Sequence, residues 1–180
     1  MKKLLLSLGL VFMAAGATMA QEQGKIRLGA GVVYGTESAI GDDGEAKGGI
    51  GFTVGGEYFI TDKISAAPSY TYFLKSKIDF LDSKMTARAS TIDLDGRYYF
   101  GNGNVAFYGL GGISIASAKV EIEDSEFIDG DSDSDSKAGI NIGAGLVYPI
   151  SDKMGLNAQI KYNTPLEQLA IQAGITFSIN

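Results

Sequence analysis

Two acids and a base recur at every second position in the segment that begins at Asp93 and continues through Asp95 to Arg97. Paired carboxylates can act as the acid and base of a hydrolase. In an extended chain, however, this spacing places all three side chains on one face, where opposite charges can pair. We interpret the group as part of an ion network, and catalysis is the weaker alternative.

A second acidic group lies in 123–136, which contains seven acids and four serines. Asp129, Asp131, Asp133 and Asp135 alternate in it, as oxygen ligands do in many calcium loops. Ser134 stands where such a loop needs glycine, and no glutamate follows at the twelfth position. We interpret the segment as a solvated loop. Weak binding of a divalent cation, alone or shared with phosphate groups of another molecule, is the alternative, and no metal site is firmly predicted.

The sequence contains no His and no Cys. Their absence excludes Ser-His-Asp and Cys-His catalysis, zinc sites built on histidine, and disulfides. Gly109, Gly111 and Gly112 lie in a predicted strand, so they do not form a phosphate-binding loop before a helix. We therefore expect neither an enzyme nor a bound cofactor.

The elements that must position these residues are β-strands, because apolar and polar or small residues alternate strictly along most of the chain. In 153–163, Leu156, Ala158 and Ile160 alternate with Asn157 and Gln159. The predicted strands are 25–35, 49–60, 64–75, 87–100, 104–122, 137–150, 153–163 and 168–179. In seven of them one face carries no charge. In 104–122 the alternation of apolar and polar residues is irregular, which suggests a bulge. Pro68 in the middle of a strand is the feature that fits least well.

The predicted connections alternate in length. Tight turns are expected at 61–63, 101–103 and 151–153, long polar loops at 36–48, 76–86 and 123–136, and a shorter loop at 164–167. Short turns at one rim and longer loops at the other are typical of outer-membrane barrels. The sequence Y-F-I-T-D-K from Tyr58 is echoed as Y-P-I-S-D-K from Tyr148. We attribute this echo to the same turn chemistry used twice, with a half-barrel repeat as the alternative.

All nine tyrosines lie near predicted strand ends, where amphipathic rings form belts at the two membrane interfaces. On this argument, Tyr99 and Tyr108 are expected to lie beside the short turns. The remaining belt residues are Tyr34, Tyr58, Tyr70, Tyr72, Tyr98, Tyr148 and Tyr162.

The first twenty residues resemble a secretory signal peptide. Lys2 and Lys3 precede an uncharged apolar run, and Ala20 ends a segment of small residues suited to cleavage. The run is too short to span a bilayer as a helix. Residues 21–180 would then form a single barrel domain with 13 basic and 21 acidic residues, a net charge of −8. Such an acidic chain is a poor nucleic-acid binder.

The signal peptide, eight strands, Y-x-I-[ST]-D-K turns and terminal strand together resemble the small bacterial outer-membrane β-barrel proteins of the OmpA-like and OmpX-like kind. The resemblance implies an all-β, eight-stranded antiparallel up-and-down transmembrane barrel. It also implies partners: outer-membrane lipid, lipopolysaccharide and the barrel assembly machinery. The signal read by that machinery would comprise Gln172, Gly174, Phe177 and Ile179, although members often end in an aromatic residue and this chain ends in Asn180.

If the barrel closes, strand parity directs six charged side chains into the lumen. They are Arg27, Glu57, Asp93, Asp95, Arg97 and Lys161. An eight-stranded lumen has room only for side chains, so these residues should pair and form a polar plug, with Arg27 and Glu57 on adjacent strands near the short-turn rim. Inward glycines leave space among them. They include Gly29, Gly31, Gly51, Gly55, Gly143 and Gly145.

We therefore predict a monomeric structural barrel that meets an extracellular partner, not specified by the sequence, through its long loops. The first alternative is a narrow channel for small solutes or ions. The second is a soluble periplasmic barrel or sandwich that binds a ligand.

Overall fold

The computed structural model describes residues 23–36, 38–39, 45–46, 49–80, 83–100, 104–122 and 134–179, and for 38–39, 45–46, 75–80, 83–88, 118–122 and 134–135 it describes the backbone alone. The predicted signal peptide lies outside these residues. The strands are β1 (Ile26–Gly35), β2 (Ser38–Ala39), β3 (Glu45–Ala46), β4 (Ile50–Phe59), β5 (Ile64–Phe80), β6 (Ser83–Phe100), β7 (Ala106–Ile122), β8 (Ser134–Pro149), β9 (Met154–Asn163) and β10 (Gln168–Ser178). In the described part of the chain, no helix is long and apolar enough to cross a membrane.

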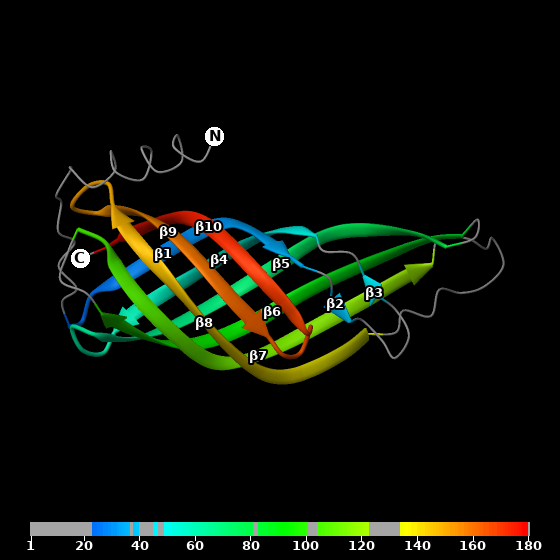
Figure 1. Cartoon of the computed structure of the whole chain (residues 1–180), viewed down its shortest axis with the longest axis horizontal. Helices are drawn as coiled ribbons and strands as arrows, with labels where there is room; N and C mark the ends of the chain where they lie inside the picture. The colour runs from blue at the N-terminus through cyan, green and yellow to red at the C-terminus, as the bar shows by residue number, and fades with distance from the viewer. Residues whose placement is uncertain are drawn as a thin grey trace, which may run out of the picture.

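Eight of these strands close into an antiparallel barrel in the order β1-β10-β9-β8-β7-β6-β5-β4 (Figure 1). Neighbours in the sequence are neighbours in the wall, and β1 closes the barrel against β10 from Arg27↔Ser178 to Gly35↔Ala170. The prediction of an eight-stranded up-and-down barrel is confirmed. The short strands β2 and β3 form a separate two-stranded sheet within the predicted loop 36–48.

The wall is apolar outside and polar inside. Along β9, side chains alternate between exposed and buried without a break, and the exposed set includes Leu156 and Ile160. Ile142 is 65% exposed on the outer face of β8, whereas its neighbour Asn141 is 2% exposed inside. A soluble barrel would have the opposite pattern, because apolar side chains are most stable away from water. The soluble alternative is therefore wrong.

Four strands are much longer than the other four. β5, β6, β7 and β8 contain 16–18 residues, compared with 10 or 11 in β1, β4, β9 and β10. Figure 1 shows the long strands continuing past the ends of the short ones toward the right of the view. The predicted loop 76–86 is therefore wrong in most of its length, because pairing continues from Ser76↔Ala87 to Phe80↔Ser83. Its polar sequence resembles a loop because a strand beyond the membrane needs no apolar face.

The strand irregularities differ from those predicted. The register of β7 with both neighbours is continuous, so the bulge predicted in 104–122 is wrong. The alternation of apolar and polar residues along β7 is irregular because Tyr108 and Leu110 are buried inside the wall instead of facing lipid. A register shift occurs instead between Phe73 and Ser76. Pro68 interrupts the pairing of β5 with β4 without shifting it.

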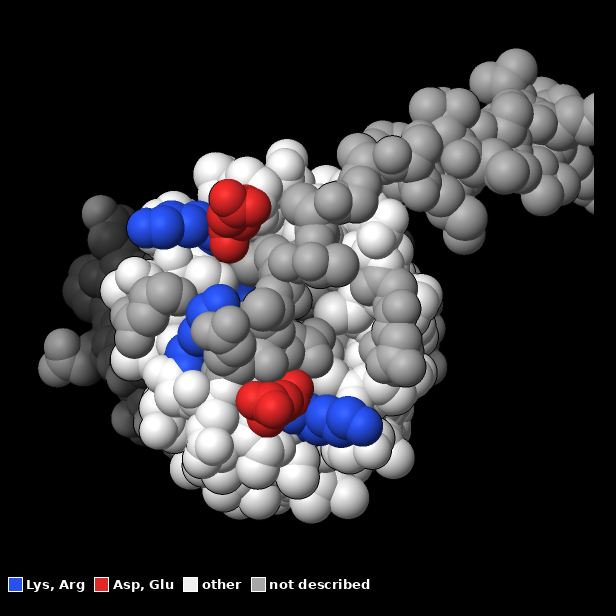
Figure 2. Space-filling model, turned by 90° about the vertical axis from the view of Figure 1, so that its left-hand side faces the viewer, with Lys and Arg blue, Asp and Glu red and all other residues white. Residues whose placement is uncertain are grey.

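The two echoed turns have the same hydrogen bonds. Ile60 N donates to Ile64 O, and Ile150 N donates to Met154 O, each at 2.9 Å. The hydroxyl of Thr61 accepts from Ile64 N, and that of Ser151 accepts from Met154 N. This identity supports shared turn chemistry as the cause of the echo. Figure 2 views the rim that carries these turns and shows its acids lying beside bases.

Candidate functional site

The inward residues of β6 show how the lumen is layered. From the short-turn rim they run Tyr99, Arg97, Asp95, Asp93 and Thr91. An aromatic layer is thus followed by a positive charge, then by two negative charges and a hydroxyl. Other strands complete each layer, because antiparallel neighbours bring their own inward residues to the same depth.

The first charged layer is the arginine cluster, which consists of Arg27, Glu57 and Arg97. Arg27 on β1 pairs in register with Glu57 on β4. Nη1 of Arg27 and Nη1 of Arg97 each lie 3.2 Å from Glu57 Oε2. One carboxylate therefore serves two guanidinium groups.

The other oxygen of Glu57 is also occupied. Oε1 accepts from the Ser65 hydroxyl at 2.6 Å and from the Tyr99 hydroxyl at 2.7 Å. Four donors on one buried carboxylate use its full acceptor capacity. Glu57 is therefore held rigidly between three strands.

An aromatic layer lies inside the barrel at the short-turn rim. Phe59, Tyr99 and Tyr108 are almost fully buried, and the ring of Tyr99 makes tilted contacts with those of Phe59 and Tyr108 at centroid distances of 5.4 and 5.2 Å. The Arg27 guanidinium lies over the Phe59 ring at 5.0 Å, and that of Arg97 lies over the Tyr108 ring at 4.7 Å. Cation–π contacts of this kind stabilise a desolvated guanidinium.

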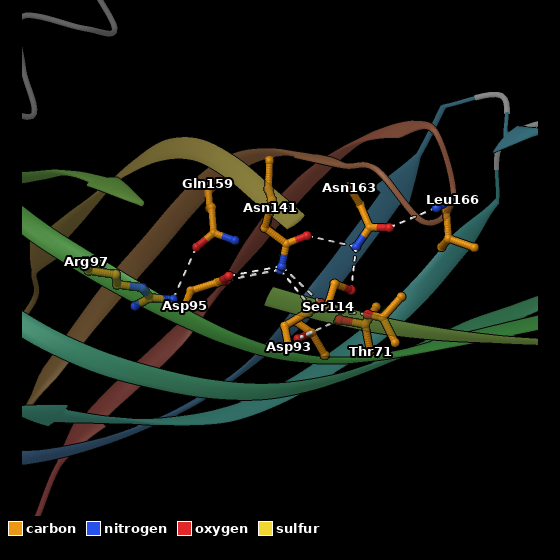
Figure 3. A network of polar contacts seen from close by, with 12 residues as sticks. Thr71, Asp93, Asp95, Arg97, Ser114, Asn141, Gln159, Asn163 and Leu166 are labelled. Atoms are coloured by element: carbon orange, nitrogen blue, oxygen red, sulfur yellow. Dashed lines mark hydrogen bonds and ion pairs between the residues drawn. The ribbon is translucent and has the colours of Figure 1, made fainter. Parts of the chain in front are cut away.

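The second charged layer is the aspartate cluster, which consists of Asp93, Asp95 and Lys161 (Figure 3 shows the two aspartates). Lys161 Nζ lies 2.8 Å from Asp93 Oδ2 and 3.3 Å from Asp95 Oδ2. The amide nitrogen of Asn141 donates to Oδ1 of both aspartates, at 3.1 and 3.0 Å. The single lysine and the bridging amide hold two carboxylates together.

The layer above is made of amides and ends in an apolar cap. Asn163 Nδ2 donates to Ser114 Oγ at 2.8 Å and to Asn141 Oδ1 at 2.9 Å, and its Oδ1 accepts from Leu166 N (Figure 3). That bond holds Leu166 in the turn 164–167, and its side chain is 4% exposed. It packs in a cluster with Val33, Phe73, Ala116 and Ala170. The lumen is thus apolar at both ends and charged between them.

All six charged residues predicted for the lumen face inward, and the structure brings them together as two clusters. The expected pairing of Arg97 with the aspartates on its own strand is absent. Arg97 binds Glu57 instead, while Asp93 and Asp95 bind Lys161. Residues two apart on a strand are separated by about 6.6 Å, so the closest partners lie across the lumen. The roles of Asn141 and Gln159 were missed, although strand parity placed Gln159 on the inner face.

The predicted belt tyrosines lie on the outside of the wall. Five are exposed, and Tyr72 and Tyr148 are half-buried there; the exposed set is Tyr34, Tyr58, Tyr70, Tyr98 and Tyr162. Tyr99 and Tyr108 were placed wrongly, because both are buried in the lumen. Of the predicted assembly signal, Gln172 and Gly174 face inward on β10, while Phe177 and Ile179 are exposed outside.

The two aspartates of the aspartate cluster are enclosed by the wall and by their partners. Asp93 and Asp95 are each 2% exposed, and their oxygens already accept hydrogen bonds. Among the described residues, no group of three or more acids could hold a metal ion. Asp129, Asp131 and Asp133 lie outside these residues, and of Asp135 only the backbone is described.

Comparison with solved structures gives the same architecture. Ail, the attachment invasion locus protein of Yersinia pestis, is 16% identical with a TM-score of 0.62, covering 87% of this chain and 99% of its own. Neisserial surface protein A is 18% identical with a TM-score of 0.64, covering 84% and 96%. OprG of Pseudomonas aeruginosa is 13% identical with a TM-score of 0.63, covering 91% and 100%. At these identities the likeness shows the fold alone.

The sequence itself also matches a family. No protein with a curated description matches the chain. The model of the family described as Outer membrane protein beta-barrel domain matches residues 4–178. With this match, and with an apolar wall around a polar lumen, the chain belongs to the outer membrane protein β-barrel domain family and is a protein of the bacterial outer membrane.

Proposed function

We propose that this protein is a non-enzymatic, monomeric barrel that displays a surface for interaction outside the cell, on a wall closed by a polar plug. The observation that carries the proposal is the extension of β5–β8 beyond the other four strands. Lipid anchors the wall, and lipopolysaccharide surrounds its outer rim. The barrel assembly machinery inserts it through the terminal strand β10.

The extension of β5–β8 carries two strand edges past the ends of β4 and β9. Pairing of β5 with β4 ends at Phe73, and pairing of β8 with β9 begins at Asn141. Residues 74–80 and 134–139 therefore form two strand edges that, within the described chain, pair with no further strand on that side. At about 3.3 Å per residue, the sheet projects about 20 Å. Unpaired edges of this length can bind an extended segment of a partner.

The plug supports an interaction role over transport. Phe59, Tyr99 and Tyr108 fill one end of the lumen, Leu166 caps the other, and ion pairs cross the middle. Breaking a buried ion pair leaves an uncompensated charge and costs several kcal/mol. The lumen is therefore more stable closed than open. The same enclosure keeps substrates away from Asp93 and Asp95, which supports the proposal that the protein is not an enzyme.

The names of two similar structures are consistent with a role at the surface. Ail is called an attachment invasion locus protein, and one of its structures is a complex with the heparin analogue sucrose octasulfate. Neisserial surface protein A is named for its location. In this chain the segment 123–136 has seven acids, which disfavours a sulfated partner and favours a neutral or basic one.

The test is a shortened barrel. In it, β5 and β6 end at the pair Phe73↔Ala89, β7 and β8 end at the pair Ala116↔Lys137, and each pair is joined by Asn-Gly, which favours a tight hairpin. Bacteria that lack the protein receive the wild-type or the shortened gene, and their retention on host-cell and matrix-coated surfaces is measured. We expect retention with the wild type and loss with the shortened barrel, while both keep the gel shift between unboiled and boiled samples. Equal retention of the strain that lacks the protein, the strain with the wild-type gene and the strain with the shortened gene would contradict the proposal.

A narrow channel is the second candidate, and one observation favours it. Cavities of about 40 and 10 Å³ lie along the lumen, and Gln159 and Gln172 line both. The two side chains that line both cavities are therefore uncharged. Planar-bilayer recordings distinguish the two functions. A plugged barrel gives no stable openings, whereas stable openings that change on neutralisation of Glu57 or Arg97 would favour the channel.

A further inference from the structure

The cavity of about 40 Å³ lies beside the arginine cluster, with Arg27, Arg97 and Glu57 among its lining residues. Gly29, Gly55 and Gly174 line the cavity too, and so do Leu28 and Ile175, which are exposed on the outer face of the wall. A cavity needs roughly 10–15 Å³ for each water, so this one holds a few waters or one small ion.

The cavity is rich in unused donors. Nε of Arg27 and Nε of Arg97 are buried and have no hydrogen-bond partner among the described residues. The side chain of Arg27 is 96% buried. The carboxylate and amide acceptors that the guanidinium groups contact are already used twice: Glu57 Oε2 binds both arginines, and Gln159 Oε1 binds Arg97 and Tyr108. These two donors therefore need an acceptor from outside the cluster.

The cluster also carries an excess positive charge, since two guanidinium groups share one carboxylate. The excess negative charge of the lumen lies in the aspartate cluster. There the four carboxylate oxygens are bound by Lys161, Asn141 and Thr91, and none is bound by an arginine. A buried charge without a nearby partner is unfavourable, and an anion in the cavity would remove this cost at short range.

We propose that this cavity binds a small monovalent anion of about the size of chloride, held by the N–H groups of Arg27 and Arg97 that Glu57 and Gln159 leave unused. A water that accepts from the guanidinium groups brings two hydrogens into a cluster already short of acceptors, whereas an anion brings none. The site does not depend on the proposed function, because it can be filled whether the lumen is closed or conducts.

Crystals of the protein purified from outer membranes in detergent, grown or soaked in sodium bromide, give the direct test. We expect an anomalous peak in the cavity between Arg27, Arg97 and the glycine-lined wall. In Arg97→Gln the cluster is neutral, and the peak should be lost. Waters alone in the wild-type cavity, with no anomalous signal, would overturn the proposal.

Unfolding in urea, with bromide exchanged for gluconate at constant ionic strength, gives the second test. If bromide binds only the folded barrel, the unfolding constant falls about tenfold when free bromide is about ten times its dissociation constant. Gly29→Ala should abolish this effect by filling the cavity, because a Cβ there fits at 3.6 Å from Thr176. Gly96→Ala is the matched control, since Gly96 is exposed outside and its Cβ is also accommodated. Equal stabilisation of wild type, Arg97→Gln and Gly29→Ala would show a general salt effect and overturn the proposal.

Discussion

The two charged layers of the lumen are both built from ion pairs, but they differ in how many of their hydrogen-bonding atoms have a partner. In the aspartate cluster, two carboxylates share one lysine, and the amide of Asn141 and the hydroxyl of Thr91 supply the remaining donors. In the arginine cluster, two guanidinium groups share one carboxylate, and both Nε atoms stay unpartnered beside a cavity. The amide nitrogen of Asn141 completes the aspartate cluster by donating twice, whereas the amide oxygen of Gln159 accepts from Arg97 and Tyr108 and leaves both Nε donors without an acceptor.

The two clusters also differ in the parts of the barrel to which they are connected. The aspartate cluster is connected through Asn141 and Asn163 to the apolar cap at Leu166, so it is continuous with the long-loop rim. The arginine cluster is backed by aromatic rings at the short-turn rim. We expect the aspartate cluster to contribute more to stability, and the arginine cluster to be more tolerant of change.

Lys161→Met should have the largest effect. It leaves Asp93 and Asp95 buried side by side without a cation, and removing one partner of a buried ion pair costs about 3–5 kcal/mol. Urea unfolding in detergent micelles or vesicles measures the loss. The double variant Lys161→Met with Asp95→Asn should recover part of it. A single variant as stable as wild type would mean that solvent already screens this cluster.

Glu57→Gln should have the next largest effect, at about 2–3 kcal/mol, because charge-assisted hydrogen bonds contribute about 1.5–3 kcal/mol. The loss is smaller than for Lys161, since the amide oxygen still accepts and the aromatic rings still face both guanidinium groups. The same unfolding experiment compares the two variants. If Glu57→Gln proves more destabilising than Lys161→Met, the order of the two clusters is reversed.

Leu166→Ala should cost about 2 kcal/mol, the lower end for truncating a buried leucine, because the cap lies at a rim that can relax. The aspartate cluster beneath it should become more accessible to water. Hydrogen exchange of backbone amides in β9 and β10, compared with those near the short-turn rim, measures this local effect. Faster exchange at both rims alike would argue against a cap that acts on one layer.

The fold could be predicted from the sequence because the two faces of a membrane barrel obey a period of two. That rule placed Asp93, Asp95 and Lys161 on the inner face without any knowledge of their contacts. Strand lengths could not be predicted in the same way. Beyond the membrane both faces of a strand meet water, so residues 76–80 and 83–86 lose the apolar face that marks a strand.

The site was less predictable, because parity gives a direction but no partner. Tyr99 has the same parity as Arg97, which places it inside, yet its nearness to a short turn suggested the aromatic belt. Its hydroxyl is instead a donor to Glu57. The partner of Arg97 depends on the stagger between β4 and β6, which are not adjacent in the wall. Stagger is set by the whole barrel and is not encoded in any one strand.

Thr71→Val should have the smallest effect and tests whether charge, and not polarity in general, distinguishes the layers. Thr71 donates to Thr53 at 3.3 Å, and it lines the smaller cavity near the aspartate cluster, whereas Thr53 lines the larger one. Valine keeps the shape and removes one neutral hydrogen bond, which contributes about 0.5–1.5 kcal/mol. We expect a loss of under about 1 kcal/mol in urea unfolding, because the bond is long and Thr53 can bind water from its cavity. A loss as large as that of Glu57→Gln would mean that the hydroxyl pair couples the two clusters, and that they act as one network across the lumen.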